Sequence, residues 1–142
     1  VSLQPHYNLA HREEFERETA ELVAKYGIGV IPYSPLEGGF LTGKYRMGRP
    51  LPDSARAERI RDRHFGERNF ALLEGLEEVG AAHGQGILQV ALAWLLTNPL
   101  VTAPIVGANT VGQVQASLAA IGFRLTAAEM KVRDDLSDWG AT

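Results

Sequence analysis

The segment from Gly38 to Lys44 carries the residue types that bind phosphate groups. It reads G-x-x-x-x-G-K and follows a short apolar run, and glycine amides next to a lysine ammonium can hold a phosphate. A magnesium-dependent nucleotide loop continues with Ser or Thr, which contacts the metal, whereas this chain has Tyr45 there. The pattern therefore favours a glycine turn in a ligand-binding loop, with a true phosphate-binding P-loop as the alternative.

Two further positions have a chemical and a structural interpretation. Tyr33 ends the apolar run, where an aromatic ring either packs against the core or offers a flat face to a planar ligand. Gly107 precedes an expected helix that starts at Thr110, and the amides at a helix N-terminus favour an anion. Ordinary capping explains Thr110 and Gln113 equally well.

No metal site and no catalytic group is predicted from the residue pattern. The chain has no cysteine, and its four histidines show no metal-ligand spacing, so surface or hydrogen-bonded roles are favoured for them: His6, His11, His64 and His83. A G-x-G-x-x-G fingerprint is also missing, which argues against an ordinary dinucleotide-binding fold of the Rossmann type.

Composition limits the class of protein. The chain has 142 residues, 45% of them apolar and 22% charged, with a net charge of -3. These values are typical of one globular domain and argue against a nucleic-acid partner. No apolar run approaches the roughly 18 residues that a membrane span needs, and the cysteine-free composition fits a cytoplasmic protein.

The elements that must position these residues form three units of a strand followed by helices. Strands are expected near residues 1–7, 28–33 and 102–106. Helices are expected over residues 11–26, 55–63, 69–83, 87–97, 110–120 and 126–139. The long stretch 34–68 has little periodicity and is expected to be a functional or disordered loop. The result is an α/β fold with three parallel strands.

Three parallel strands are an incomplete fold. They cannot close a barrel, and as an open sheet they leave two apolar edges unpaired. The chain also begins with Val1 inside an apparent strand. These features predict that residues 1–142 are one domain-sized fragment of a larger structure.

Three sequence blocks resemble the C-terminal part of the aldo-keto reductase family. They are QPHYNL at residues 4–9, GIGVIPYSPL at 27–36 with LTGKY at 41–45, and ALAWLL at 91–96 leading to APIVGA at 103–108. The resemblance implies a (β/α)8, or TIM, barrel of which this chain supplies the last three units. It also implies hydride transfer from NADPH to an aldehyde or ketone.

The resemblance assigns residues to an extended cofactor. Gln4 is expected to bind the nicotinamide carboxamide and Tyr33 to stack on the nicotinamide ring. The residues expected to meet the pyrophosphate are Ser34, Pro35, Leu36, Gly38, Lys44 and Arg56. Those expected near the adenosine 2′-phosphate and adenine are Gly107, Asn109, Gln113 and Ser117. Many relatives carry Ser, Arg or Lys at position 109, and no cation follows Asn109 here, so NADH is the alternative cofactor. Relatives often carry Asn at position 117, so Ser117 implies weaker recognition of the adenine.

The resemblance implies no catalytic residue in this chain. The family's proton-donating Tyr, Lys, Asp and His have no match here, so we expect cofactor binding without turnover. The expected partners are a small carbonyl substrate and either the missing N-terminal barrel half or a second copy. The alternative function is a non-catalytic nicotinamide-binding or structural barrel module.

Overall fold

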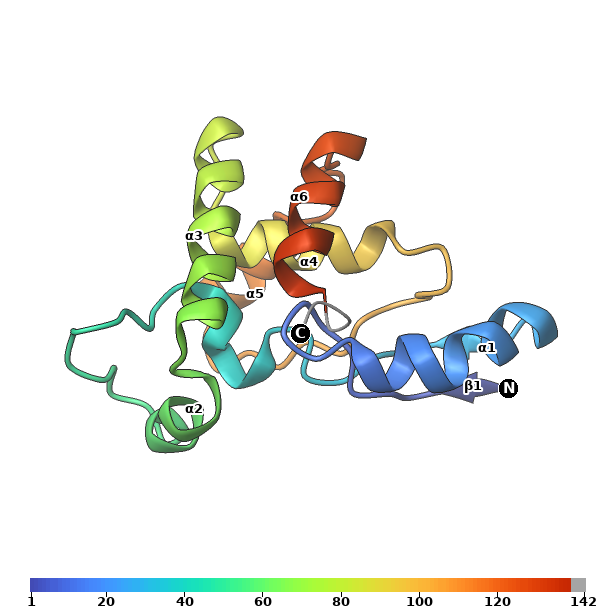
Figure 1. Ribbon diagram of the computed structural model, residues 1–142, viewed down its shortest axis with the longest axis horizontal. Helices are drawn as coiled ribbons and strands as arrows, with labels where there is room; N and C mark the ends of the chain where they lie inside the picture. Colours follow the sequence, from blue (N-terminus) through green and yellow to red (C-terminus); the bar gives the residue numbers. More distant parts are fainter. Residues whose placement is uncertain (139–142) are drawn as a thin grey trace.

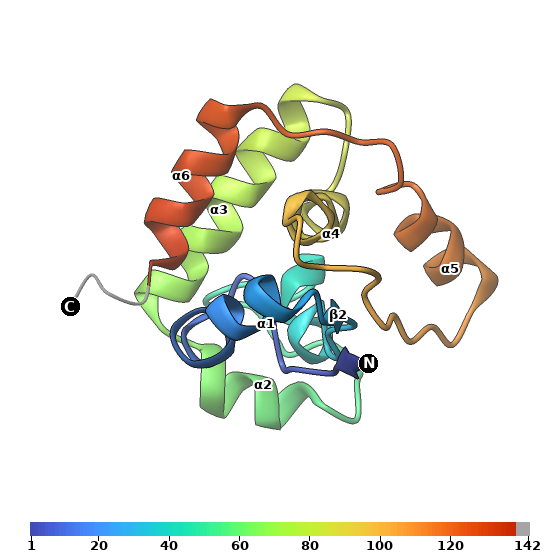
Figure 2. The same cartoon turned by 90° about the vertical axis from the view of Figure 1, so that its right-hand side faces the viewer.

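The computed structural model describes residues 1–138. The helices over residues 67–97 and 127–137 lie together on one side of the molecule, and the small parallel sheet lies on the other side with the two earlier α-helices (Figure 1). Helices α3 (Glu67–Ala82) and α6 (Ala127–Ser137) run side by side, and α4 (Ile87–Thr97) crosses beneath them, as Figures 1 and 2 agree. The α/β class predicted from the sequence is confirmed, but the sheet is much smaller than expected.

The sheet has two strands, not the three predicted. Strand β1 (Ser2–Leu3) pairs in parallel with β2 (Gly29–Val30). The predicted third strand, 102–106, is reduced to a bridge between Val30 and Val101 and single hydrogen bonds such as Ile105 N–H to the Pro32 carbonyl at 2.8 Å.

Proline explains why the strands end early. Pro5, Pro32 and Pro104 each lie inside a predicted strand, and a proline has no N–H to donate to a ladder. Backbone pairing nevertheless continues past the assigned strands, because Tyr33 N–H donates to the Pro5 carbonyl at 3.0 Å. The predicted side-by-side arrangement of the three segments is therefore kept without a regular ladder.

The predicted 11–26 helix is shorter and irregular. It begins as a π-helical turn, η1 (Phe15–Thr19), and continues as α1 (Ala20–Tyr26) until Gly27 adopts a left-handed φ of 60°. Phe15 and Val23 are buried as the spacing predicts. The i, i+7, i+8, i+11 spacing of Phe15, Leu22, Val23 and Tyr26 predicts one apolar helix face. Leu22 and Tyr26 are 51% and 66% exposed, so that part of the prediction is wrong.

The stretch 34–68, predicted as a long loop with a short helix over 55–63, contains that helix, a second helical piece and the start of a third. These are η2 (Glu37–Thr42), α2 (Ala57–His64) and the first turn of α3. Phe40 and Leu41 of η2 are fully buried, which anchors the glycine-rich turn in the core. Only the part between η2 and α2 extends away from the body of the molecule in Figure 1.

The helical layer follows the sequence prediction closely. Helix α4 has the predicted bounds and is buried on most sides. Helix α5 (Val111–Leu118) is capped by Thr110. Helix α6 is capped by the reciprocal Thr126–Glu129 pair, as its T-x-x-E sequence predicts. Helix α6 ends at Ser137, and the predicted end at residue 139 lies outside the described residues.

Among residues 1–138, no single helix combines the length and apolar character needed to cross a membrane. Helices α3 and α4 satisfy that criterion only as a pair, and they are bent by 93° at the break between them.

Tyr45 gives a stability prediction. Its side chain is fully buried among aromatic rings, and its hydroxyl has no hydrogen-bond partner among the described residues. A buried hydroxyl without a partner is destabilising by about 1–3 kcal/mol. We therefore expect Tyr45→Phe to raise the free energy of unfolding by about 1 kcal/mol in urea denaturation. Tyr26→Phe, at an exposed ring, is the control, and a clear loss of stability in Tyr45→Phe would contradict the prediction.

Candidate functional site

The segments that follow the strands reach one edge of the sheet. Gln4 follows β1, Tyr33 follows β2 by three residues, and Ile105 is hydrogen-bonded beside Pro32. Parallel segments bring their carboxyl ends to the same edge, which is where α/β proteins bind ligands. Gln4 is exposed there, and its amide makes no hydrogen bond to a described residue.

Tyr33 presents one ring face outward and is supported from behind. Its side chain is 43% exposed. The His6 ring lies behind it, with centroids 5.1 Å apart and an 18° angle between the planes, and His11 stacks on the other side of His6 at 4.0 Å. This column of three rings fixes the Tyr33 plane, so its open face can receive a planar ring.

The turn after Tyr33 is held in a left-handed backbone conformation. Ser34 and Glu37 have φ values of 50° and 47°, and Gly38 and Gly39 follow with 62° and 100°. The backbone N–H groups of Ser34 and Leu36 donate to no described residue. Free amides in a tight turn bind anionic oxygens. Pro35, predicted to line the pyrophosphate, has its side chain buried instead.

Two cations flank this turn. The Lys44 ammonium lies beside Gly39, because a Cβ added to Gly39 would be 3.3 Å from Lys44 Nζ. The Arg56 side chain lies beside Gly38, because a Cβ added to Gly38 would be 3.8 Å from Arg56 Cδ. Both cations are exposed, and neither has an acidic partner among residues 1–138. Free amides and two unpaired cations at one turn suit a diphosphate.

The second predicted group follows the third extended segment. Gly107 and Asn109 are exposed before α5. Gln113 accepts from Asn109 N–H at 2.7 Å and donates through its own backbone N–H to Thr110, and the Ser117 hydroxyl donates to the Gln113 carbonyl. The two contacts of Gln113 are helix capping, and the Ser117 contact is a side-chain-to-backbone bond within α5. The preceding segment is bonded beside β2 only as far as Ile105, whose N–H donates to the Pro32 carbonyl, and no described contact joins this group to the Tyr33 turn.

The alternative of a true P-loop is wrong. Such a loop passes directly into a helix at its Gly-Lys pair, whereas η2 ends at Thr42 and the next helix begins at Ala57. Lys44 is in an irregular segment.

A buried carboxylate under the turn was not predicted from the sequence. Glu37 is only 7% exposed and contacts three side chains from distant segments: His6, Asn8 and His64. Burial by itself raises the pKa of Glu37, but hydrogen bonds from His64 and Asn8 and the charge of His6 outweigh it and lower the pKa to about 2. Contacts that span 27 to 31 residues leave no local sequence signal.

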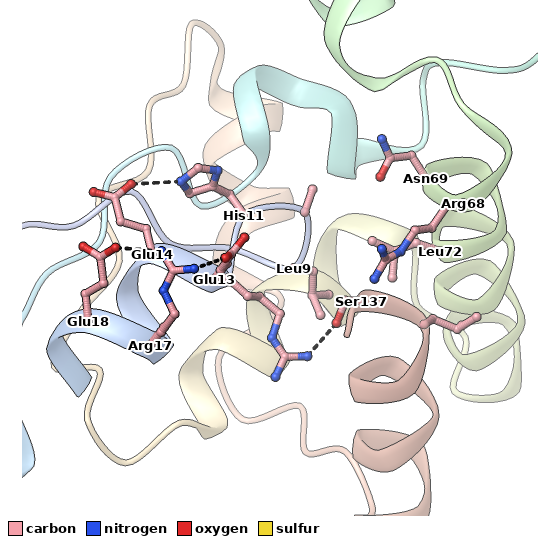
Figure 3. Close-up of a pocket in the computed structure, with 13 residues that line it drawn as sticks. Leu9, His11, Glu13, Glu14, Arg17, Glu18, Arg68, Asn69, Leu72 and Ser137 are labelled. Atoms are coloured by element: carbon pink, nitrogen blue, oxygen red, sulfur yellow. Dashed lines mark hydrogen bonds and ion pairs between the residues drawn. The ribbon is translucent and has the colours of Figure 1, made fainter. Parts of the chain in front are cut away.

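A hollow of about 510 Å³ lies elsewhere, between the segment after β1, the start of α3 and the end of α6 (Figure 3). Its walls carry charges of both signs, and several are already paired, including Arg17 with Glu13 and His11 with Glu14. None of the twelve predicted cofactor residues lines it. The sheet edge, which gathers an aromatic face, free amides and unpaired cations, is therefore the stronger candidate.

Comparison with known proteins identifies the family of the chain. The model of the aldo/keto reductase family matches residues 1–138. An aldo-keto reductase of Fusarium vanettenii is 36% identical over 140 residues, which cover 96% of this chain and 36% of that protein. A probable voltage-gated potassium channel subunit beta of Oryza sativa is 34% identical over 122 residues, 83% of this chain and 37% of that protein.

A solved structure resembles the chain in fold as well. The glycerol dehydrogenase of Gluconobacter oxydans is 30% identical with a TM-score of 0.78, over 95% of this chain and 41% of that one. The chain thus spans about two fifths of the length of the relatives it matches. On the match over residues 1–138, the chain belongs to the aldo/keto reductase family.

Proposed function

We propose that this chain is the cofactor-binding part of an NADPH-dependent oxidoreductase that reduces aldehydes or ketones to alcohols. The observation that carries the proposal is the turn after β2. Unpaired Lys44 and Arg56 flank left-handed glycines there, and Tyr33 presents an open ring at its start. A dinucleotide with a planar ring at one end and a diphosphate in the middle matches this order of groups.

The exposed residues at the sheet edge have the following proposed roles. Exposed Gln4 orients the carboxamide of a ring stacked on Tyr33. The Ser34 and Leu36 amides and the two cations bind the diphosphate. When bound, NADPH supplies the hydride, and the chain's contribution is to present the ring at a fixed orientation.

The adenosine end is proposed at Gly107, Asn109, Gln113 and Ser117. Because Asn109 brings no cation, the 2′-phosphate is held by amides and polar side chains alone. NADH therefore remains the competing cofactor, and comparing the two affinities decides between them.

We propose that the chain is the C-terminal part of a (β/α)8 barrel. The support is an extended segment beside β2 with few regular pairs, and apolar side chains left exposed near it: Ile105 at 43%, Val114 at 45% and Leu118 at 55%. Helix α5, which carries the last two of these side chains, has no buried residue of its own, and a helix in a complete domain normally buries its apolar side chains against a partner. The partner is the remaining β/α units or a second copy, in a cytoplasmic setting.

Titration with NADPH tests the cofactor assignment. We expect the purified chain to bind NADPH saturably, with a change in nicotinamide fluorescence, and to reduce no aldehyde or ketone alone because it has no residue matching the family's proton donors. The control is the Tyr33→Ala chain, which loses the ring on which the nicotinamide is expected to stack and should bind NADPH more weakly. No binding by the wild-type chain would contradict the cofactor assignment. Saturable turnover by this chain alone would contradict the proposal that it binds the cofactor without carrying the proton donors.

A second candidate is a non-catalytic nicotinamide-binding module. Its support is that some relatives carry the name of a potassium-channel beta subunit. Adding the N-terminal part of a related reductase distinguishes the two functions: restored turnover favours the enzyme, and tight binding that stays without turnover favours the module.

A further inference from the structure

Glu37 occupies a backbone conformation that a glycine would adopt more easily. Its φ of 47° lies in the left-handed region, and the next two residues, Gly38 and Gly39, are glycines with positive φ. A residue with a Cβ is disfavoured there. The side chain of Glu37 must therefore make contacts that offset this conformational strain.

Those contacts are short and join three separate segments. Glu37 Oε2 lies 2.6 Å from His6 Nε2 and accepts from Asn8 Nδ2 at 2.7 Å. The other oxygen, Oε1, lies 3.1 Å from His64 Nε2 at the end of α2. An ionised carboxylate only accepts hydrogen bonds, so both histidine nitrogens carry a proton toward it.

The Oε2 contacts lead directly to the Tyr33 face. His6 is the ring on which Tyr33 stacks, and the Asn8 amide that donates to Glu37 also donates to the Ser34 carbonyl at 2.9 Å. One oxygen atom therefore fixes both the ring behind Tyr33 and the backbone just after it. Glu37 itself lies beneath this surface, with a side chain that is 9% exposed.

We propose that Glu37 is a positioning residue for the nicotinamide-binding face, acting through His6 and Asn8 on Tyr33 and Ser34. The proposal rests on the cofactor assignment above. In this role Glu37 acts from beneath the binding face. It limits the freedom of the Tyr33 ring, so less order has to be gained when a planar ring binds.

The prediction is selective between the two ends of the cofactor. In Glu37→Gln one oxygen becomes an NH₂ group, so the amide side chain can no longer accept from His6, Asn8 and His64 together. We expect affinity for NADPH to fall about tenfold. Affinity for 2′-phospho-ADP-ribose, which lacks the nicotinamide, should stay within about twofold of the wild type, because the phosphate-binding groups are untouched.

A readout without any ligand accompanies the titrations. The ring-proton NMR signals of Tyr33 should move in Glu37→Gln, because the His6 ring behind it is released. Glu78→Gln, an exposed carboxylate on α3 with no described partner, is the matched control and should change neither affinity nor the Tyr33 signals. Glu37→Gly, which removes the backbone strain, is the second variant if Glu37→Gln does not fold.

The outcomes separate this inference from the cofactor assignment. Selective loss of NADPH affinity with moved Tyr33 signals supports the proposal. Unchanged NADPH affinity in a folded Glu37 variant, or equal loss of both ligands, overturns it while the wild-type chain still binds NADPH. Failure of the wild-type chain to bind NADPH overturns the cofactor assignment and this proposal with it. If neither Glu37 variant folds, Glu37 serves the fold and the proposal is overturned.

Discussion

Replacing both Lys44 and Arg56 with alanine is expected to weaken NADPH binding about 100-fold. Both side chains lie beside the left-handed turn without an acidic partner among the described residues. A hydrogen bond to a charged group contributes about 1.5–3 kcal/mol, so the lower figure for each cation gives roughly tenfold apiece. Fluorescence titration at two salt concentrations measures the loss and should show a weaker salt dependence in the double variant.

The matched control is Arg59→Ala. Arg59 is an exposed cation on α2, three residues beyond Arg56, and it has no described ion pair. Its removal should leave the affinity within about twofold, because it does not flank the turn. Equal losses in Arg59→Ala and in the double variant would mean that general surface charge binds NADPH, and would contradict the assignment.

Acidification is expected to remove the stability that Glu37 contributes. The folded-state pKa of Glu37 is about 2, below its ordinary value of 4.5. A depressed carboxyl pKa contributes stability that is present above the unfolded-state pKa and is lost as the pH falls from about 4.5 toward 2. The contribution is at most about 3 kcal/mol.

The comparison with Glu37→Gln isolates this effect. Glu129 at the cap of α6 also has a pKa lowered to about 2, first by the Thr126 backbone and then by His83, and it titrates in the same range. Urea unfolding of both chains at several pH values should show a gap at pH 6 that closes between pH 4.5 and 2. A gap that stays constant over this range would show that the Glu37 carboxylate contributes nothing through its charge.

Much of the helical layer could be predicted because its signals are local. Helix α4 is apolar on nearly every side, and the N-cap residues Thr110 and Thr126 mark the starts of the helices that follow them. The strands were predicted too long because apolar residues continue past Leu3 and Val30 while prolines interrupt the hydrogen bonds.

The candidate site was predictable only in part, because only some of its residues have a local sequence signal. Gln4, Tyr33 and the glycine turn stand in recognisable sequence blocks, and the structure brings them to one edge. The carboxylate beneath them is different. Glu37 is polar and lies in a turn, which in sequence suggests exposure, yet it is buried because His6 and His64 approach it from other segments.

The central claim is that a nicotinamide cofactor binds at the edge of the sheet. Backbone amide shifts in the ¹H–¹⁵N NMR spectrum of the chain, recorded as NADP⁺ is added, test it most directly. We predict that the shifts concentrate on Gln4, on residues 33–44 and on residues 107–113. Shifts concentrated instead around Arg12, Arg68 and Ser137, which line the hollow of Figure 3, would contradict it.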